Sequence, residues 1–274
     1  MKCMKSELLA ILPGNVRCIV QDKLIHELDE IRLRIGTPTR LVSGNKVTSA
    51  GDKITSEDLK FCVNTASKFS PWNASTISEG YLTAPGGHRI GLCGVCAGET
   101  IRNLTSLCIR VAKDIPDLGK HLPLPDSTLI IGPPGSGKTT LLRCLIRRLS
   151  RTGSGSIAVA DERCELFPIV NGTVCFDPGE NTDILSGKEK GSGIIHLLRS
   201  MGPEWIAVDE ITSKEDCEFM VQAGWCGVKF LATAHAVHVS DLYSRTLYRP
   251  LLDTGLFHHV IVMHPDKTCH AERI

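Results

Sequence analysis

The stretch Gly132-Pro133-Pro134-Gly135-Ser136-Gly137-Lys138-Thr139-Thr140 decides how the rest of the sequence is interpreted. It has the spacing of a phosphate-binding loop, in which four residues separate a first glycine from Gly-Lys-Thr. The apolar run Thr128–Ile131 before it predicts a buried strand, and Leu141–Ile146 after it predicts a helix. Glycines let backbone N–H groups surround phosphate oxygens at a helix N-terminus, where the helix dipole favours anions. The sequence therefore predicts a nucleotide-binding loop between a strand and a helix.

Two side chains of the loop and two that follow another strand are expected to act together. We expect Lys138 to neutralise the β- and γ-phosphates of ATP and the Thr139 hydroxyl to bind Mg²⁺. The apolar run Trp205–Val208 ends in Asp209-Glu210, and ligands of parallel sheets bind at the carboxyl ends of the strands. Asp209 is therefore the second predicted Mg²⁺ residue, acting through water, and Glu210 is a candidate base for activating the attacking water.

Two further strand ends carry polar residues that are expected at the same edge. Asp161-Glu162-Arg163 follows the run Ser156–Ala160, so Glu162 competes with Glu210 for the role of base. Thr233-Ala-His235 ends the run Val228–Thr233, and a polar group there can sense the γ-phosphate and couple its loss to motion. A purely structural role for His235 is the alternative.

The second half of the chain, residues 122–274, alternates short apolar runs with helical stretches. This pattern is typical of a parallel sheet covered by helices on both faces. The expected strands are Thr128–Ile131, Ser156–Ala160, Trp205–Val208, Val228–Thr233 and Val260–Met263. The expected helices are Lys138–Ser150, Glu189–Met201, Lys214–Trp225 and Ser240–Leu252.

The first half, residues 1–121, has shorter and more mixed segments and predicts a smaller α+β domain. The expected helices are Lys5–Leu12, Asp22–Leu28 and Ser56–Lys68. The expected strands are Ile31–Ile35, Arg40–Val42, Lys46–Thr48, Gly80–Thr83, His88–Cys93 and Leu107–Val111, with a tight turn at Pro85–Gly87. The proline-containing segment His121–Asp126 predicts the linker between the two domains.

Composition excludes several classes of protein. The 274 residues include 31 Lys and Arg and 30 Asp and Glu, a net charge of +1, with 22% charged and 42% hydrophobic residues. These values favour a soluble globular chain and argue against a broad nucleic-acid footprint. No apolar run approaches the ~20 residues that span a bilayer, and we expect no transmembrane segment and no secretory signal. The predicted location is cytoplasmic.

Twelve cysteines without a secretory signal favour a reducing compartment, where most act as small buried hydrophobes. The only tight spacing is Cys93-Gly-Val-Cys96, and no second pair completes a zinc site. A redox pair is expected at the start of a helix, whereas this one follows the strand-like run Arg89–Leu92. We therefore expect structural thiols, and the role of the Cys93/Cys96 pair stays open.

Two other patterns are assigned no function. Arg143, Arg147 and Arg151 recur every four residues on the helix after the loop, and we interpret them as a solvated face near a helix C-terminus, where cations are favoured. Leu185-Ser-Gly-Lys188 resembles the signature of transporter-type (ABC) ATPases. Too few residues separate it from the phosphate-binding loop for the helical subdomain that those proteins insert there. We therefore reject that interpretation.

Taken together and in order, several stretches resemble the stage III sporulation protein AA family. The resemblance covers both halves of the chain, and the ordered set of motifs is more specific than any one of them. In the second half it rests on Gly132–Leu142, Asp161–Arg163, Leu198–Pro203 with Trp205–Ile211, and Ala232–His235. In the first half it rests on Glu30–Gly36, Glu79–Leu82, Gly86–Gly91 and Leu107–Ala112.

That family is similar to the secretion ATPases that drive type II and type IV machines and pili. The resemblance implies a RecA-like core and an ATPase of the mother-cell cytoplasm. Its partners would be proteins of a membrane-embedded sporulation complex that joins mother cell and forespore. It also implies a homo-oligomer, a hexameric ring with nucleotide between subunits. Secretion ATPases direct arginines of the N-terminal module toward the nucleotide, and by motif position Arg110 is the best match, ahead of Arg102 and Arg89.

The combined prediction is an Mg²⁺-dependent P-loop ATPase that uses slow ATP hydrolysis to move or assemble a membrane-bound partner. Its contact with the membrane would be peripheral, through partner proteins. Two alternatives stay open: a nucleotide-gated scaffold with little turnover, and a translocase stimulated by nucleic acid. The translocase would need a basic tract interleaved with aromatic residues, but the three Trp and three Tyr are scattered along the chain.

Overall fold

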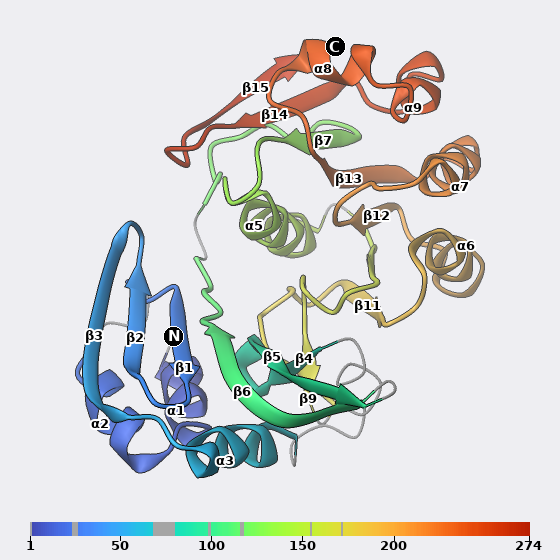
Figure 1. Cartoon of the computed structure of the whole chain (residues 1–274). Helices are drawn as coiled ribbons and strands as arrows, with labels where there is room; N and C mark the ends of the chain where they lie inside the picture. Colours follow the sequence, from blue (N-terminus) through green and yellow to red (C-terminus); the bar gives the residue numbers. More distant parts are fainter. Residues whose placement is uncertain are drawn as a thin grey trace. The chain divides into compact units, whose positions relative to one another are not determined.

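The computed structural model describes residues 2–23, 27–67, 80–97, 100–115, 118–153, 155–170 and 172–274. The chain forms two compact units, and each has a hydrophobic core of its own (Figure 1). The first unit contains residues 1–114 and 168–176, and the second contains residues 115–167 and 177–274.

The predicted linker, and the residues just before it, which are called the joint below, belong to the second unit. Arg148 of helix α5 (Lys138–Arg151) donates hydrogen bonds at 2.7 to 3.0 Å to carbonyl oxygens of the joint, those of Gly119, Lys120 and Leu122. Because these bonds fasten the joint to α5, the division falls after residue 114, whereas the sequence pattern placed it after residue 121. The segment 168–176, which the pattern assigned to the second domain, groups with the first unit.

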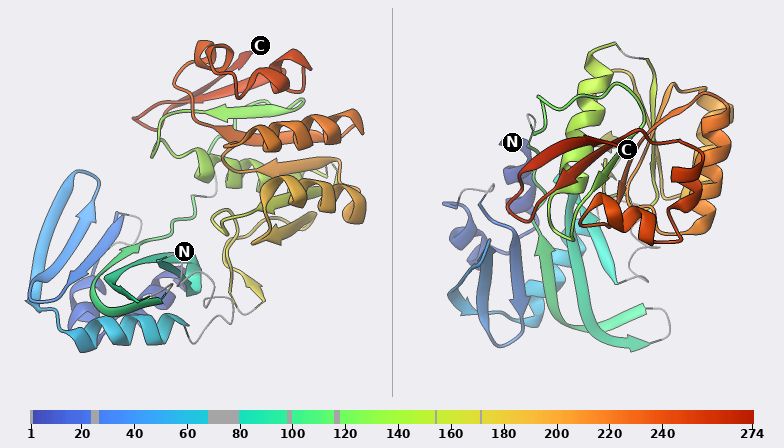
Figure 2. Two further views of the ribbon diagram at one scale, coloured as in Figure 1. Left: turned by 45° about the vertical axis from the view of Figure 1, so that its right-hand side comes forward. Right: turned by 90° about the horizontal axis from the view of Figure 1, so that it is seen from above.

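The first unit is built on an antiparallel six-stranded sheet in the order β3-β2-β1-β6-β5-β4. Its strands are β1 (Glu30–Arg34), β2 (Pro38–Ser43), β3 (Lys46–Lys53), β4 (Tyr81–Ala84), β5 (His88–Ala97) and β6 (Thr100–Arg110). In β1, Ile31 and Leu33 are buried between more accessible polar residues, so one face of the sheet is apolar. Helices α1 (Lys2–Ala10), α2 (Gly14–Val20) and α3 (Ser56–Ser67) supply the apolar side chains that pack on this face (Figure 2). The expected α+β character is confirmed.

One expected helix of this unit is wrong. The sequence analysis placed a helix at Asp22–Leu28, but the structure has α2 earlier, at Gly14–Val20. Pro13 occupies the N-cap position with an extended backbone, and Val16 and Val20 are buried one turn apart. The described residues of the expected helix are turn or irregular, and residues 24–26 lie outside the described part. The proline therefore sets the start of the helix.

The second unit contains a seven-stranded sheet in the order β11-β8-β12-β13-β7-β14-β15. Its strands are β7 (Thr128–Ile131), β8 (Ile157–Asp161), β11 (Thr182–Ser186), β12 (Trp205–Val208), β13 (Lys229–Ala234), β14 (His259–Met263) and β15 (Cys269–Arg273). All neighbouring strands are parallel except β14 and β15, which form an antiparallel hairpin. The parallel strands bring their carboxyl ends to one edge, as predicted.

Helices cover both faces of this sheet. Helix α5 lies on one face, and α6 (Lys190–Met201) and α7 (Lys214–Trp225) lie on the other (Figures 1 and 2). Alternate strand residues such as Ile206 and Val208 of β12 pack with Met220 of α7 in one fully buried cluster. The expected parallel sheet with two covered faces is confirmed. No helix in the described ranges combines the length and the apolar character needed to cross a membrane.

Several elements differ from the expected ones. The helix expected at Ser240–Leu252 is two short helices, α8 (Val239–Ser244) and α9 (Arg249–Asp253), because Arg245 adopts an extended backbone and a proline starts α9. The strands β11 and β15 were missed because they lie at the sheet edges and lack an apolar run. A short hairpin, β9 (Ile169–Val170) and β10 (Thr173–Val174), was also missed.

A buried histidine links distant parts of the first unit. His88 is fully buried; its Nε2 lies 3.0 Å from the carbonyl oxygen of Met4, and its Nδ1 accepts a hydrogen bond of 3.1 Å from the backbone N–H of Ala112. Because Nδ1 accepts, Nε2 carries the proton and donates to Met4. Burial lowers the pKa of His88 to about 4. The neutral imidazole thus ties α1 to the segment after β6.

The free energy of unfolding should fall as the pH is lowered from 7 to 5, and His88 should account for about 2 kcal/mol of that fall. In the unfolded chain this histidine takes up a proton near pH 6.5, whereas in the folded chain it stays neutral down to about pH 4. Between pH 6.5 and about pH 4, proton uptake by His88 therefore favours the unfolded chain. The contribution of His88 to folding stability is fully present only above the pKa of the unfolded state. Urea denaturation followed by circular dichroism at both pH values measures the difference.

The variant His88→Gln keeps a donor and an acceptor but does not titrate, so it should lack this part of the pH dependence. His196→Gln, at an exposed position of α6, is the matched control and should keep it. A pH dependence in His88→Gln equal to that of the unmodified chain would contradict the assignment.

Candidate functional site

The loop between β7 and α5 has the backbone that its glycines predict. Gly137 is the N-cap residue of α5 and has φ of 101°, a left-handed conformation that favours glycine. A Cβ added at Gly132 would lie 2.6 Å from the carbonyl oxygen of Met263, so only glycine fits beside β14. The Ser136 hydroxyl is buried and finds no hydrogen-bond partner among the described residues. The loop therefore has a glycine-dependent turn at the start of a helix, and its binding of phosphate stays a prediction.

The ammonium group of Lys138 is nearly buried, and it makes three polar contacts within the protein. Its Nζ donates to the carbonyl oxygens of Gly132 at 2.8 Å and Pro133 at 3.0 Å, and it lies 3.2 Å from Nδ1 of His235. Burial lowers the pKa of Lys138, and the carboxylates of Asp209 and Glu210 oppose that shift. The predicted loop lysine and the predicted histidine therefore lie in contact.

The predicted Mg²⁺ residues also lie in contact. The Thr139 hydroxyl donates to Oδ2 of Asp209 at 2.9 Å, and the Thr233 hydroxyl donates to Oδ1 of the same carboxylate at 2.6 Å. The Thr233 oxygen in turn accepts from the backbone N–H of Glu210 at 2.7 Å. Strands β12 and β13 are parallel neighbours with Val208 opposite Ala232, so their ends place Asp209 beside Thr233.

Glu210 continues this network from β12 to the acidic segment after β8. Its Oε1 lies 2.7 Å from Nε2 of His235, and its Oε2 forms an ion pair of 2.8 Å with Arg163. Because Lys138 can only donate to Nδ1 of His235, the histidine carries its proton on Nε2 and donates it to Glu210. The four side chains Lys138, His235, Glu210 and Arg163 thus form one continuous polar chain.

The buried Asp161 side chain holds the turn of the acidic segment through backbone hydrogen bonds. Its Oδ1 accepts from the backbone N–H of Glu165 and its Oδ2 from that of Phe167, both at 2.9 Å. The side chain is 3% exposed, and burial raises its pKa to about 6. Asp161 is therefore a structural residue of the turn, which leaves Glu162 and Glu165 as the acids that the turn presents.

A small pocket at the strand ends is lined by carboxylates from two strands, and it includes one residue that sequence reasoning missed. Glu162 and Glu165 line it from the acidic segment, and Asp209 and Glu210 line it from the end of β12. Glu165 was missed, although its spacing of three residues after Glu162 is a signal that could have identified it. The pocket therefore holds three candidate bases, where the sequence predicted two.

Lys190 was also missed, and it joins the two acidic segments. It lies 5% exposed at the start of α6, and its Nζ donates to the carbonyl oxygen of Glu210 at 2.6 Å. The same atom lies 3.4 Å from Oδ2 of Asp216 and 3.6 Å from Oε2 of Glu162. No sequence signal marks this lysine, because its neighbours Gly187–Glu189 are polar and exposed.

Two of the three arginines of α5 that were interpreted as a solvated face are buried in the structure. Arg143 and Arg147 are buried, at 7% and 4% exposure, so the predicted solvated face is wrong. Arg147 donates from Nε to the carbonyl oxygen of Asp177 at 2.7 Å, and Arg151 pairs with the carboxylate of the same residue. These arginines fasten the segment before β11 to α5.

The predicted nucleotide arginine belongs to the first unit. Arg110 is exposed at the end of β6, opposite Glu30 of β1 and Arg89 of β5. The Arg89 guanidinium lies over the ring of Tyr81, 4.0 Å from its centroid. The side chain of Arg102 lies outside the described part. A role for Arg110 toward a nucleotide stays a prediction.

The fold is that of the secretion ATPases, with their RecA-like core. The ATPase DotB of Legionella pneumophila matches with a TM-score of 0.59 at 16% identity, over 94% of this chain and 78% of DotB. The pilus retraction motor PilT, solved with bound ADP, matches with a TM-score of 0.63 at 15% identity, over 89% of this chain and 76% of PilT. At these identities the likeness shows the fold alone, and it confirms the predicted fold class.

Sequence comparison then identifies the family. The family described as "Sporulation stage III, protein AA" matches residues 2–272. Stage III sporulation protein AA of Bacillus subtilis (strain 168) is 32% identical over 273 residues, which cover 92% of this chain and 88% of that protein. The chain therefore belongs to the stage III sporulation protein AA family, as the ordered motifs predicted.

Replacing Thr233 with valine should lower the free energy of unfolding by about 1–3 kcal/mol. The valine keeps the shape of the buried side chain but removes the donor to Asp209 and the acceptor for the N–H of Glu210. The serine variant keeps the hydroxyl and should lose much less stability. Urea denaturation of both variants measures this, and a valine variant as stable as the unmodified chain would contradict the role assigned to the hydroxyl.

Proposed function

We propose that the chain binds ATP with Mg²⁺ at the β7–α5 loop and hydrolyses it. The observation that carries this proposal is the contact of Thr139 with Asp209, 2.9 Å apart, directly beside the Lys138 ammonium group. A hydroxyl and a carboxylate at the end of a phosphate-binding loop are the oxygen ligands that P-loop proteins use for Mg²⁺. Loop N–H groups would hold the phosphates, and Lys138 would neutralise their charge.

The residues present fit such a metal. No group of three or more His, Cys, Asp or Glu side chains in the described ranges is arranged to hold an ion unaided. Mg²⁺ in nucleotide sites needs only one or two protein oxygens, because phosphate oxygens and water complete its coordination. When bound, Mg²⁺ would neutralise charge that develops on the phosphates. Thr139 and Asp209 are the residues that would hold it.

The base that activates water would be one of three carboxylates. Glu210 accepts on both oxygens, from His235 and Arg163, so as placed it is engaged as a link in the polar chain. Glu162 lies 3.6 Å from the Lys190 ammonium group, and Glu165 lines the same pocket. The arrangement favours Glu162 or Glu165 as the base and gives Glu210 a part in sensing.

The polar chain supplies a means of coupling nucleotide binding to motion. Lys138 would exchange its contact with Nδ1 of His235 for a phosphate oxygen, which changes the partner of His235 and then that of Glu210. The carbonyl oxygen of His235 also accepts from Arg245 at 2.6 Å, just beyond α8. A change at the phosphate would therefore reach α8 through the segment after β13.

The family and the fold together support a proposal for the biological role. We propose that this ATPase is a cytoplasmic motor that acts on a membrane-embedded sporulation complex through partner proteins. A hexameric ring would place Arg110 of one subunit at the nucleotide of its neighbour. The scaffold alternative is supported by the three contacts that Lys138 makes within the protein, because exchanging them for a phosphate would slow turnover. Measuring ATP turnover with and without the purified partner complex separates the two roles.

The variant Lys138→Ala should abolish ATP turnover and weaken ATP binding, because Lys138 is the lysine of the loop Gly132–Thr140 and would neutralise the phosphates. Phosphate release measured on the full chain tests this. Lys188→Ala, at an exposed position before α6, is the matched control and should keep activity. Full turnover in Lys138→Ala would refute the enzymatic role.

Single replacements of Glu162, Glu165 and Glu210 by Gln should then identify the base. The base variant is expected to bind ATP as the unmodified chain does and to lose roughly 100-fold or more in turnover, the usual contribution of general base catalysis. ATP binding measured by calorimetry alongside phosphate release separates the two effects. Three variants with unchanged turnover would contradict a carboxylate base.

Mixing two inactive variants tests the proposed arginine in trans. Arg110→Ala keeps the phosphate-binding loop and Lys138→Ala keeps Arg110, so a ring containing both should regain activity at about one quarter of its subunit interfaces in a random equimolar mixture. Turnover of each variant alone and of the mixture measures this. Arg34→Ala, exposed at the far end of β1, should be active by itself. A mixture as inactive as its components would exclude Arg110 acting in trans.

A further inference from the structure

Arg163 is a cation among the carboxylates of the pocket at the strand ends. It follows β8 by two residues, and β8 is the parallel neighbour of β12, so both strands end at the same edge of the sheet. The pocket that Asp209 and Glu210 line from the end of β12 is lined by Arg163 as well. Asp209 in turn contacts Thr139 at the start of α5. The arginine therefore belongs to the same pocket as a side chain proposed to hold Mg²⁺.

The guanidinium group of Arg163 is held loosely. Within the described residues, its hydrogen bond runs from Nη1 to Oε2 of Glu210, at 2.8 Å. The side chain of Arg163 is 57% exposed and that of Glu210 is 32% exposed. An ion pair this accessible contributes little to folding stability, because water screens it. A guanidinium group has several N–H donors, so this pair leaves most of them to solvent or to a ligand.

The lysines at this edge of the sheet are held more tightly than Arg163. Lys138 is nearly buried beside the loop. Lys190 is 5% exposed, and its ammonium group contacts the carbonyl oxygen of Glu210 and the buried carboxylate of Asp216. An anion that attracted Lys190 would break these buried contacts, at a large desolvation cost. Arg163 can turn from Glu210 to an anion in the pocket without breaking any buried contact.

The strand order indicates which phosphate of a bound nucleotide would reach Arg163. The strands run β8-β12-β13-β7, and the loop follows β7. Asp209 at the end of β12 would face the metal between the last two phosphates of ATP. Arg163, after β8, lies one strand farther from the loop. A nucleotide that directs its terminal phosphate toward Asp209 therefore brings that phosphate, ahead of the others, to Arg163.

We propose that Arg163 binds the γ-phosphate of ATP within its own chain and gives the site a preference for ATP over ADP. Guanidinium groups bind phosphate oxygens through two parallel N–H groups, which makes the contact strong and directional. In this exchange Arg163 leaves Glu210, whose other oxygen keeps the contact with His235. This inference rests on the proposed ATP binding at the β7–α5 loop.

The exchange would make the polar chain sensitive to the γ-phosphate. Its two ends are the cations Lys138 and Arg163, and Glu210 and His235 lie between them. ADP would engage Lys138 alone, because Lys138 also neutralises the β-phosphate. ATP would engage both ends and would take the counter-charge of Arg163 away from Glu210. The state of Glu210 would then report whether the γ-phosphate is present.

The test compares binding of the non-hydrolysable ATP analogue AMP-PNP with binding of ADP. Both are titrated with Mg²⁺ into the full chain by calorimetry, for the unmodified protein and for Arg163→Ala. The unmodified chain should prefer AMP-PNP. Arg163→Ala should bind AMP-PNP about tenfold more weakly, as expected for loss of a charge-assisted contact, and should bind ADP unchanged. Unchanged ADP binding also shows that the variant is folded.

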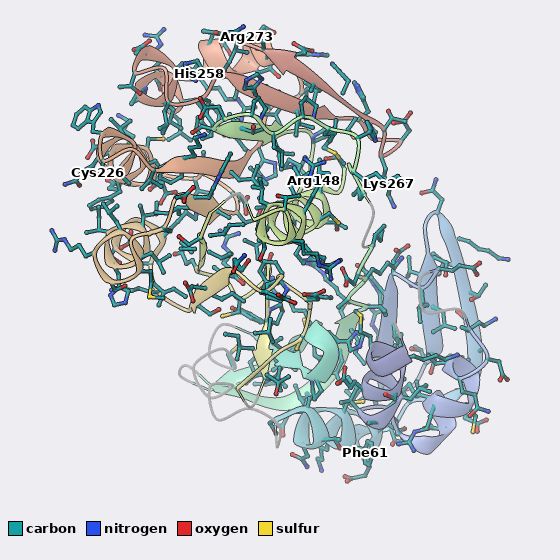
Figure 3. All side chains as sticks on the ribbon, turned by 180° about the vertical axis from the view of Figure 1, so that it is seen from behind. Phe61, Arg148, Cys226, His258, Lys267 and Arg273 are labelled. Atoms are coloured by element: carbon teal, nitrogen blue, oxygen red, sulfur yellow. The ribbon has the colours of Figure 1, made fainter. Side chains whose placement is uncertain are left out.

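A conservative variant and a matched control accompany this comparison. Arg163→Lys keeps the charge without the planar fork and should retain part of the AMP-PNP affinity. The control is Arg273→Ala, which should bind both nucleotides as the unmodified chain does. Arg273 is exposed on β15 opposite His259, the first residue of β14, so it lies at the edge of the sheet away from the loop (Figure 3).

The outcomes separate this role of Arg163 from other roles. Equal weakening of AMP-PNP and ADP in Arg163→Ala would overturn the proposal, because Arg163 would then support the site as a whole. Unchanged or tighter AMP-PNP binding would overturn it as well, and so would an unmodified chain that binds the two nucleotides equally. An unmodified chain that binds neither nucleotide would instead overturn the proposed function, and the role of Arg163 with it.

Discussion

The Asp209 carboxylate is the group on which the geometry of the site depends. It accepts from Thr139 at the start of α5 and from Thr233 on β13, and it stands itself at the end of β12. Three separate elements are therefore held in register by two oxygens. Hydrogen bonds to a charged carboxylate are about twice as strong as neutral ones, and the parallel order β12-β13-β7 places each partner at the same edge. The start of α5 and the end of β13 are positioned together because the Asp209 side chain accepts a hydrogen bond from each.

The polar chain from Lys138 to Arg163 shows how this edge is stabilised. A buried ammonium group without acceptors would carry a large desolvation cost, and here two carbonyl oxygens and His235 satisfy it. His235 in turn donates a hydrogen bond from Nε2 to Glu210. Arg163 forms an ion pair with the same carboxylate and balances its charge. A bound phosphate would compete for the same ammonium group. Its binding, as proposed, would therefore exchange the partners of Lys138 within the polar chain.

The sequence predicted those parts of the site that depend on local spacing. The loop Gly132–Thr140 and the strand-end Asp209 could be predicted because glycine spacing and strand ends are visible in one stretch of chain. Lys190 and Arg147 were not, because their partners come from other elements and nothing in the sequence marks a lysine or arginine as buried. Edge strands β11 and β15 were missed for a related reason: a half-exposed strand has no apolar run to reveal it.

Lys190 connects the acidic residues at the strand ends to the helices that cover the sheet. Its buried ammonium group is shared by the carbonyl oxygen of Glu210, by Asp216 in the first turn of α7, and by Glu162. Removing one partner of a buried charge typically costs about 3–5 kcal/mol, so these groups resist separation. Glu210 has φ of 55°, a conformation that is uncommon outside glycine and is maintained here by bonds on both its N–H and its carbonyl oxygen. A displacement of Glu210 is therefore coupled, through Lys190, to the starts of both α6 and α7.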